Sequence, residues 1–435
     1  MIREPLVFVA TCEIAGRVRG KGFPLKELKS RMKSGVGWVP TNTMISCFGP
    51  IADTPFGATG DLILVPDEKT RVDVDFGDGS AAERWFLGDI RLTDGSPWEC
   101  CPRHFLKRAL AELDQVAGLQ LYSTFEQEFM LESVEDRPGA PYSLDAWRRQ
   151  GNFGETFIAA VRAAGVEPDS FLAEYGARQY EVTCAPAVGV TAADDAIKVR
   201  EMARATASRL GTRVTFAPIL DPDGTGNGVH IHFSFRDRAG KPATHDPAGV
   251  AGLTTTAAHF MAGIIAHMPA LCAITAPSVA SYIRLRPNRW APTWTYLADR
   301  DREASLRVCP VLSLPGIDPG KSYNVEFRVA DGAASPYLAL GALVHAGVDG
   351  IRRKLPLTPA SGVAAMSEEA RQAAGIRPLP RTLAEALDAL EHDAAAKEWF
   401  GVAYLDAYLR HKRAEIAMLG DADEAEQCRR YGASY

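Results

Sequence analysis

The chain has 435 residues, of which 46% are hydrophobic and 23% are charged, and its formal net charge at pH 7 is −6. This length predicts two unequal domains, and the composition is that of a soluble globular protein with a sizeable core. The negative charge and the absence of any basic run exclude nucleic acid and anionic membranes as expected partners. Eight scattered cysteines without CxxC spacing predict reduced thiols, and the apolar run at residues 6–10 is too short for a signal peptide, so we expect a cytoplasmic protein.

Residues 1–98 are predicted to form a β-rich domain, and residues 99–435 a second, larger domain. In the first, residues 6–13 and 17–20 predict a hairpin, residues 24–33 a short helix and residues 61–67 a strand. Residues 41–60 are rich in Gly, Pro and Thr and have no periodicity, which indicates a long functional loop.

The second domain is predicted to open with a helix from Pro102 to about Leu113, because proline is favoured at the first helical position. A helix over 192–210 is predicted to place Leu210 toward the core and to stop at Gly211. We also expect a strand over 213–220 and a buried helix over 247–268. The chain from residue 336 on is predicted to be mostly helical, with a charged, exposed tail.

Four strands of this domain are predicted to present polar side chains on one face. Residues 229–235 alternate, with Val, Ile and Phe on one side and two histidines and a serine on the other. The strands over 124–131, 179–183 and 323–329 alternate in the same way with acidic side chains. The polar set, completed by a glutamate between two of these strands, consists of Glu126, Glu128, Glu174, Glu181, His230, His232, Ser234 and Glu326.

Five carboxylates close together would repel one another strongly, and divalent cations relieve such repulsion. Oxygen ligands with one imidazole suit Mg²⁺ or Mn²⁺ better than Zn²⁺. Basic residues suited to clamping carboxylate and phosphate groups follow in the sequence: Arg284, Arg302, Arg307, Lys321 and Arg328. Metals facing several arginines indicate phosphoryl transfer.

The ordered motifs FEQEF, RQYEV with a glutamate seven residues before its own, GNGVHIHFS, SYIRL, DREASLR and NVEFR resemble those of the glutamine synthetase superfamily. The resemblance covers nearly the whole length. It implies an α+β fold with an N-terminal β-grasp domain and a catalytic domain whose curved antiparallel sheet is flanked by helices. It also implies ATP as co-substrate, two or three Mg²⁺ or Mn²⁺ per site, and homo-oligomeric rings, either dodecamers or decamers.

The resemblance also implies a role for each matching residue. Glu128, Glu174 and Glu181 resemble ligands of a first metal, and Glu126, His230 and Glu326 those of a second. Gly226 and Arg284 match glutamate-binding positions, while Arg302 and Arg328, together with Glu181, match catalytic ones. His232, Ser234, Arg307 and Lys321 match positions near ATP.

The sequence departs from the family pattern where the amine would bind. The loop glutamate that helps deprotonate ammonium falls on Trp290, and the N-terminal aspartate has only Asp53 as a nearby candidate. Arg178 stands where a glycine is usual, and Thr225 replaces an asparagine. Trp290 could serve only to pack its loop, but the loss of both acids favours a changed acceptor amine.

The leading hypothesis is therefore an ATP-dependent ligase that activates the γ-carboxylate of L-glutamate as γ-glutamyl phosphate and transfers it to an alkyl or aromatic primary amine, with Trp290 in the substrate site. An ordinary glutamine synthetase using ammonia is the alternative within the family. From other classes, a metal-dependent hydrolase built on His230 and His232 and a catalytically inactive relative are also considered.

Overall fold

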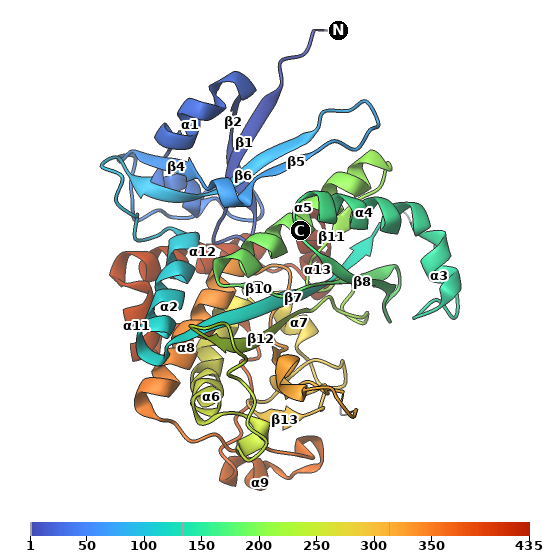
Figure 1. The fold of residues 1–435 in the computed structure, drawn as a ribbon, viewed down its shortest axis with the longest axis vertical. Helices are drawn as coiled ribbons and strands as arrows, with labels where there is room; N and C mark the ends of the chain where they lie inside the picture. Colours follow the sequence, from blue (N-terminus) through green and yellow to red (C-terminus); the bar gives the residue numbers. More distant parts are fainter. Residues whose placement is uncertain (1, 133, 313) are drawn as a thin grey trace.

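The computed structural model describes residues 2–132, 134–312 and 314–435, and it forms a smaller part and a larger part that lie one above the other in Figure 1. The smaller part holds a six-stranded sheet in the order β2-β1-β6-β4-β3, with β5 also paired to β6. Its strands are antiparallel except for the β1–β6 pair. Its elements are β1 (Leu6–Cys12), β2 (Val18–Pro24), α1 (Leu28–Ser34), β3 (Val36–Trp38), β4 (Leu62–Pro66), β5 (Val72–Val74) and β6 (Glu83–Leu92).

The predicted hairpin is confirmed, since β1 and β2 pair along their whole lengths around a turn at Gly16. Gly16 has φ of +67°, and a Cβ there would lie 2.3 Å from the carbonyl oxygen of Ala333 in the larger part. Glycine is therefore required both for the turn and for the close approach of the two parts.

The larger part is built on a nine-stranded sheet in the order β13-β14-β15-β12-β7-β9-β8, with β10 and β11 also paired to β7. The sheet is antiparallel except for the β13–β14 pair at its edge. Its strands are β7 (Leu119–Leu131), β8 (Pro168–Ala173), β9 (Gln179–Cys184), β10 (Ala187–Val188), β11 (Val214–Thr215), β12 (Val229–Asp237), β13 (Leu297–Asp299), β14 (Leu306–Val308) and β15 (Val325–Phe327).

Helices cover the apolar face of this sheet, and α2, α6 and α8 lie beside one another on it in Figure 1. Phe125 and Phe129 of β7 are buried on that side, as predicted from the alternation. The helices are α2 (Pro102–Ala117), α3 (Leu144–Arg149), α4 (Gly151–Ala163), α5 (Val190–Arg209), α6 (Thr255–Thr275), α7 (Ser281–Arg284), α8 (Pro336–Arg353), α9 (Glu368–Ala373), α10 (Leu383–His392), α11 (Ala394–Phe400), α12 (Val402–Leu419) and α13 (Glu424–Ser434).

Two sequence predictions in this part were wrong, one in the length of a strand and the other in the direction of a side chain. Of the strand predicted over 213–220, only Val214–Thr215 pairs, because after Thr215 the chain leaves the edge of β7, and the amide of Phe216 instead donates to the carbonyl oxygen of Tyr435. Leu210 is 46% exposed at the end of α5 rather than directed to the core.

The helix predicted over 247–268 is α6, which begins at the N-cap Thr254 and continues through Pro269. Proline at 269 cannot donate to the carbonyl oxygen of Ile265. The guanidinium of Arg377 instead donates to the carbonyl oxygens of Ile265 and Ala266, at 3.2 and 3.0 Å. By length and hydropathy α6 could cross a membrane, but 78% of its apolar window is buried inside the protein, so it is the core helix that was predicted.

The prediction of an exposed C-terminal tail was also wrong. Tyr431 and Tyr435 of the last helical segment are buried, and the Tyr435 hydroxyl donates to the carbonyl oxygen of Ala15, 2.7 Å away in the smaller part. The charged residues of α13 occupy the face opposite these buried residues. The helix is therefore amphipathic, and its many charged residues led the sequence prediction to a wholly exposed tail.

Candidate active site

The predicted acidic and histidine residues lie on one face of the large sheet because neighbouring strands pair them directly. The directly opposite pairs are Glu126–His230, Glu128–Glu181, His232–Glu326 and Arg307–Glu326. Directly opposite residues of antiparallel strands have their Cβ atoms about 5 Å apart. The register of β14, β15, β12, β7 and β9 therefore gathers these groups into one cluster.

The inner part of the cluster is centred on Glu326, which is 1% exposed. His230 Nδ1 lies 2.7 Å from Glu126 Oε1 and 3.4 Å from Glu326 Oε1, and His232 Nε2 lies 3.5 Å from Glu126 Oε2. The possible ligand atoms of Glu126, Glu128 and His230 lie within 4.8 Å of one another, as do those of Glu126, His232 and Glu326. These mainly oxygen donors fit Mg²⁺ or Mn²⁺.

The carboxylates that receive no hydrogen bond from a histidine are those that most need a cation. Burial raises the pKa of Glu128 to about 8; a hydrogen bond from the amide of Gly228 acts against this, and the charge of Glu174 adds to it. Burial and the neighbouring carboxylates likewise raise the pKa of Glu181. Burial also raises the pKa of Glu126, but hydrogen bonds from His230 and His232 bring it well below its usual value. A divalent cation beside Glu128 and Glu181 would relieve this repulsion.

Two residues to which the sequence analysis assigned no role hold Glu174 and Glu128 in place. Tyr142, in the loop before α3, donates its hydroxyl to Glu174 Oε2 at 2.7 Å. Gln179 donates through Nε2 to Glu128 Oε2 at 3.0 Å and to the carbonyl oxygen of Gly226 at 2.8 Å. Gln179 could have been found, because it shares the polar face of its strand with Glu181, whereas no pattern in the sequence links Tyr142 to Glu174.

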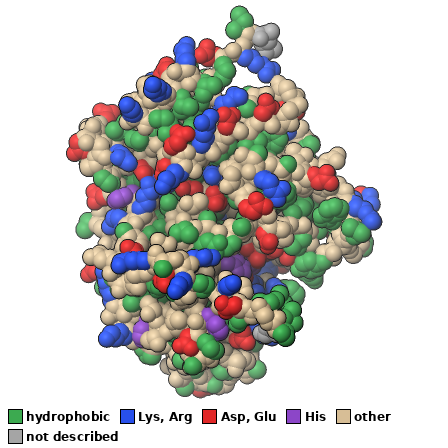
Figure 2. Space-filling view, in the orientation of Figure 1, with side chains coloured by type: hydrophobic (Ala, Val, Ile, Leu, Met, Phe, Trp, Pro, Cys, Tyr) green, Lys and Arg blue, Asp and Glu red, His purple; other side chains and the backbone are tan. Residues whose placement is uncertain are grey.

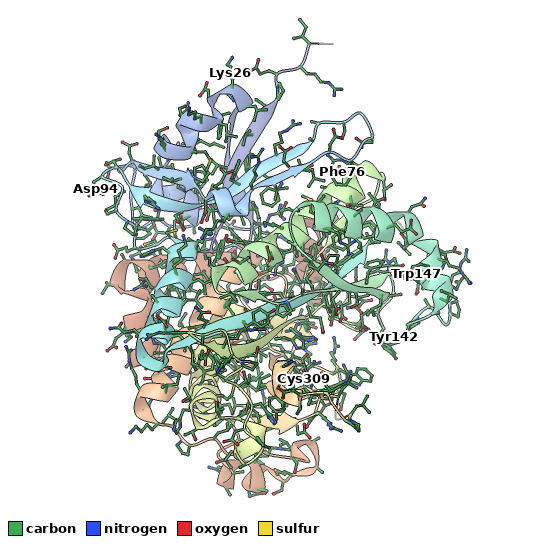
Figure 3. All side chains as sticks on the ribbon, viewed as in Figure 1. Lys26, Phe76, Asp94, Tyr142, Trp147 and Cys309 are labelled. Atoms are coloured by element: carbon green, nitrogen blue, oxygen red, sulfur yellow. The ribbon has the colours of Figure 1, made fainter. Side chains whose placement is uncertain are left out.

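The cluster opens into two adjoining cavities of about 410 and 820 Å³. The smaller cavity is also lined by Gly226, Arg284 and Arg328, and the larger by Arg307 and Trp147. Residues shared by both are Glu126, Tyr142, Glu174, Glu181, Trp290 and Arg302. In Figure 2 the surface is hollowed at the right, where acidic, basic and histidine side chains gather, and Figure 3 shows Tyr142 and Trp147 on the upper side of this opening.

The smaller cavity contains a buried guanidinium that Gly226 makes room for. Arg284 is 5% exposed, its Nη2 donates to the carbonyl oxygens of Val329 and Ala330, and its Nε faces the buried carboxylate of Asp331, 3.8 Å from Oδ2. A Cβ on Gly226 would lie 2.4 Å from Cγ of Arg284. Glycine at 226 is thus needed for this packing, and Arg284 brings to the cavity wall a guanidinium, a group suited to binding a carboxylate.

Arginines lie around Glu326, at the other side of the cluster of carboxylates and histidines. Arg328 forms an ion pair with Glu326 and donates through Nε to the carbonyl oxygen of Arg302 at 2.9 Å. Arg307 Nε lies 2.7 Å from Glu326 Oε2. Arg302 is exposed and lines both cavities, so its charge faces the space where a phosphoryl group could bind.

Trp290 stands at the junction of the two cavities with a 63% exposed side chain and φ of +53°. Its carbonyl oxygen accepts a hydrogen bond from Arg328 Nη2 at 3.5 Å, and its ring stacks on Tyr175 with 6.1 Å between centroids. The indole therefore lies beside the cluster and is not packed into a core.

Three residues considered from the sequence lie elsewhere. Among the described residues that line the cavities, neither Ser234 nor Lys321 is present; Ser234 is farther along β12, opposite Tyr122, and Lys321 is exposed in a 3₁₀ turn. Asp53 forms an ion pair with Arg410 at 2.6 Å and lines neither cavity within the described ranges.

Two family models together match almost the whole chain. Residues 3–98 match the glutamine synthetase N-terminal domain, and residues 99–431 match the glutamine synthetase catalytic domain. Among curated relatives, the chain is 33% identical over 433 residues to "Gamma-glutamylpolyamine synthetase GlnA3" of Streptomyces coelicolor, covering 96% of this chain and 91% of the relative. It is 32% identical over 408 residues to "Glutamine synthetase" of Pyrococcus furiosus, covering 92% and 87%.

Two solved structures superpose on almost the whole chain. A structure described as "Crystal structure of novel glutamine synthase homolog" superposes with a TM-score of 0.93 at 41% identity, covering 100% of this chain and 99% of the other. A "GmaS/ADP complex" superposes with a TM-score of 0.81 at 26% identity, covering 95% and 94%.

Proposed function

The chain belongs to the glutamine synthetase family and is a ligase that forms carbon–nitrogen bonds, and from that premise we propose that its acceptor is a primary amine carrying a hydrocarbon group. ATP phosphorylates the γ-carboxylate of L-glutamate, the amine displaces phosphate, and a γ-glutamyl amide results. This assignment as a ligase replaces the hydrolase alternative built on His230 and His232.

In this proposal the buried Arg284, which lines the smaller cavity, holds the α-carboxylate of glutamate through its guanidinium, and Gly226 contributes its backbone. Arg302 and Arg328 balance the charge of the transferring phosphoryl group, with Arg307 and His232 nearer the nucleotide. Mg²⁺ or Mn²⁺, when bound by Glu126, Glu128, Glu174, Glu181, His230 and Glu326, would supply the remaining positive charge. Ser234 and Lys321 are retained as ATP-side residues from the family resemblance alone.

The position of Trp290 is the observation that favours an acceptor amine with a hydrocarbon group over ammonia. It lines both cavities and stacks on Tyr175, so the amine approaches the γ-carboxylate past two exposed aromatic rings. An indole has no hydrogen-bond acceptor and cannot take a proton from ammonium. It can contact a hydrocarbon substituent, or a cation through its π-face.

The test compares kcat/KM for ammonia, methylamine, ethylamine, isopropylamine, ethanolamine, n-butylamine, putrescine and aniline, in the wild type and in Trp290→Glu. Phosphate release dependent on ATP, L-glutamate and Mg²⁺ is the readout, and Glu128→Gln is the control that should abolish it. We expect alkyl or aromatic amines to exceed ammonia by at least about tenfold, which is 1.4 kcal/mol of differential binding, and Trp290→Glu to reverse the order. Preference for ammonia in the wild type, unchanged in Trp290→Glu, would identify an ordinary glutamine synthetase in which Trp290 only packs the loop.

A polyamine is a second candidate because Asp223 also lines the smaller cavity and the chain resembles a gamma-glutamylpolyamine synthetase. A distal ammonium group could pair with this carboxylate, whereas Asp299 and Asp301 line neither cavity within the described residues. The two candidates differ in one comparison: putrescine should surpass n-butylamine, and lose that advantage in Asp223→Asn, only if the acceptor is a polyamine.

The family resemblance also leads us to propose a cytoplasmic, ring-shaped homo-oligomer, either a decamer or a dodecamer. Light scattering on the purified protein would give the number of subunits, and a stable monomer under assay conditions would contradict a ring.

A further inference from the structure

Five large aromatic or aliphatic side chains are exposed around the candidate active site. They are Tyr142, Leu144, Trp147, Tyr175 and Trp290, each between 43% and 63% exposed, and every one of them lines at least one of the two cavities. Apolar side chains that gather in this way on a globular protein mark a surface that binds a ligand or a partner. Trp290 and Tyr175 border the path of the amine in the proposed function, whereas, among the described residues, Leu144 and Trp147 line the larger cavity alone.

These last two side chains stand at the β8 edge of the large sheet. Leu172 of β8 lines the cavity beside them and lies directly opposite Glu181 of β9, so it continues the sheet face that carries the carboxylates. Arg307 lines the same cavity from β14, near the other edge of the sheet. In Figure 1, α3 and β8 lie at the right, and β13, the neighbour of β14, lies below them. The larger cavity thus has a basic side and, across from it, an apolar wall formed by Leu144, Trp147 and Leu172.

Hydrogen bonds fix the helix that carries most of this apolar wall. The hydroxyl of Ser143 caps α3 by accepting from the amide of Ala146 at 3.1 Å, and Ala146 itself is buried. The amide of Tyr142 donates to the carbonyl oxygen of Ala173 at 3.1 Å, which joins the start of the helix to β8. Trp147 therefore belongs to a capped helix attached to the sheet, a position suited to shaping a binding site.

The larger cavity is the space left for the substituent of the acceptor amine. The amine nitrogen must reach the γ-carboxylate of glutamate near the junction of the cavities, where Glu174 and Trp290 lie. The smaller cavity holds Arg284 and Gly226, the groups proposed to bind glutamate. A hydrocarbon group can extend into the larger cavity of about 820 Å³, where contact with the apolar wall removes its surface from water.

We propose, on the basis of the proposed function, that the substituent of the acceptor lies against the apolar wall and that Trp147 selects an arylalkyl amine over a short alkyl amine. Aromatic rings pack favourably against one another, and Trp147 and Trp290 offer two exposed indoles to such a ring. The reaction is unchanged: the amine nitrogen bonds to the γ-carbon, the bond from this carbon to the phosphate oxygen breaks, and phosphate leaves with that electron pair. The ammonium form of the amine gives up two protons in all to solvent.

The test is the ratio of kcat/KM for 2-phenylethylamine to kcat/KM for methylamine, measured by phosphate release. The wild-type ratio should exceed about ten, and Trp147→Ala should lower it at least about tenfold, because the substrate ring loses an aromatic contact. Trp147→Phe should retain most of the ratio, and Leu144→Ser, a second variant of the apolar wall, should lower it by a smaller factor. Arg148→Ala is the control, since Arg148 is the next residue of α3, is exposed and lines neither cavity within the described ranges.

Binding of the products tests the apolar wall without turnover. In calorimetric titrations, γ-glutamyl-2-phenylethylamide should bind the wild type more tightly than γ-glutamylmethylamide, and Trp147→Ala should remove the difference. A wild type that prefers ammonia to every amine would reject the proposed acceptor, but a difference between the two amides that depends on Trp147 would still support the apolar wall as a hydrocarbon site.

Three results would overturn the role of Trp147, each together with an unchanged ratio in Trp147→Ala that circular dichroism shows to be folded. The first is a preference between amines and ammonia that still responds to Trp290→Glu, which would keep the proposed function alone. The second is a raised KM for ATP, which would place the nucleotide against the indole. The third is a changed number of subunits in light scattering, which would assign the apolar wall to a contact between copies of the chain. If Trp147→Ala does not fold, Leu144→Ser takes its place, and an unchanged ratio there contradicts the wall.

Discussion

At the scale of single residues, hydrogen-bond partners decide which buried charges the protein tolerates without a ligand. Glu326 is buried, yet the charges of His230 and Arg328 bring its pKa below the usual value, whereas burial, with the neighbouring carboxylates adding to it, raises the pKa of Glu128. Arg178, directly before Gln179 in the chain, shows backbone strain, since it adopts φ of +59°, a conformation that favours glycine; its side chain donates to the carbonyl oxygen of Glu132.

His267 is a second buried charge, remote from the active site. Its Nδ1 lies 2.6 Å from Asp393 Oδ2 and its Nε2 lies 2.9 Å from Asp349 Oδ2. A ring that donates to two carboxylates must be protonated on both nitrogens. Burial lowers the pKa of His267, but the hydrogen bonds with Asp393 and Asp349 raise it above the usual 6.5 overall. Arg353 also pairs with Asp349, so the cluster of these groups links α6, α8 and the start of α11.

We therefore predict that His267→Phe destabilises the protein by about 3 kcal/mol at about pH 6 and by clearly less at about pH 9. The folded-state pKa is raised, so the stabilisation is complete below pH 6.5 and is lost as the pH rises through the folded-state value. Urea midpoints at both pH values measure this. His259→Phe is the control, because His259, on the same helix, hydrogen-bonds the carbonyl oxygen of Leu355 and a neutral ring suffices. An equal loss at both pH values would contradict a charged His267.

At the scale of elements, α6 and α8 cross with their backbones in direct contact. A Cβ on Gly350 would lie 2.2 Å from the carbonyl oxygen of His259 and 2.6 Å from Cα of Gly263. A Cβ on Gly347 would meet the ring of Phe260 at 2.2 Å. The two glycines of the segment AGVDGI are therefore explained by helix packing, independently of catalysis.

The prediction at this scale is that Gly350→Ala costs about 2–3 kcal/mol, because the two helices must separate. Gly151→Ala is the matched control, since a Cβ at the start of α4 has nothing within 4 Å. That control should be neutral or slightly stabilising, since alanine favours helices. Equal thermal midpoints for Gly350→Ala and the wild type would refute the close crossing.

At the scale of the whole molecule, the last residue joins the two parts of the chain. Tyr435 is 3% exposed, its carbonyl oxygen accepts from Phe216 and Arg204, and its hydroxyl donates to Ala15. Ala15 lies in the β1–β2 turn, so this small cluster couples the turn of the smaller sheet to the edge of the larger one.

Removal of this side chain should loosen the junction. We predict that Tyr435→Ala lowers stability by about 3–5 kcal/mol, the usual cost of deleting a buried aromatic ring, and that Tyr435→Phe costs about 1 kcal/mol for the lost hydrogen bond. Limited proteolysis should then release the N-terminal part faster in Tyr435→Ala. Wild-type stability in Tyr435→Ala would show that the junction does not depend on this contact.

The sequence by itself determined the class of fold, the family and the polar face of each central strand, because alternation along a strand is a local property that residue types record directly. It also provided the residue types from which a divalent-cation site could be predicted. Only the tertiary structure decided the strand register, which sets Glu126 opposite His230 and Glu128 opposite Glu181. Hydrogen bonds between distant segments likewise could not be predicted from local sequence patterns. Examples are the bonds from Tyr142 to Glu174, from Arg377 to the carbonyl oxygens that Pro269 leaves without a donor, and from Tyr435 to Ala15. Each joins residues at least 32 positions apart in the chain, where hydrophobic periodicity carries no information.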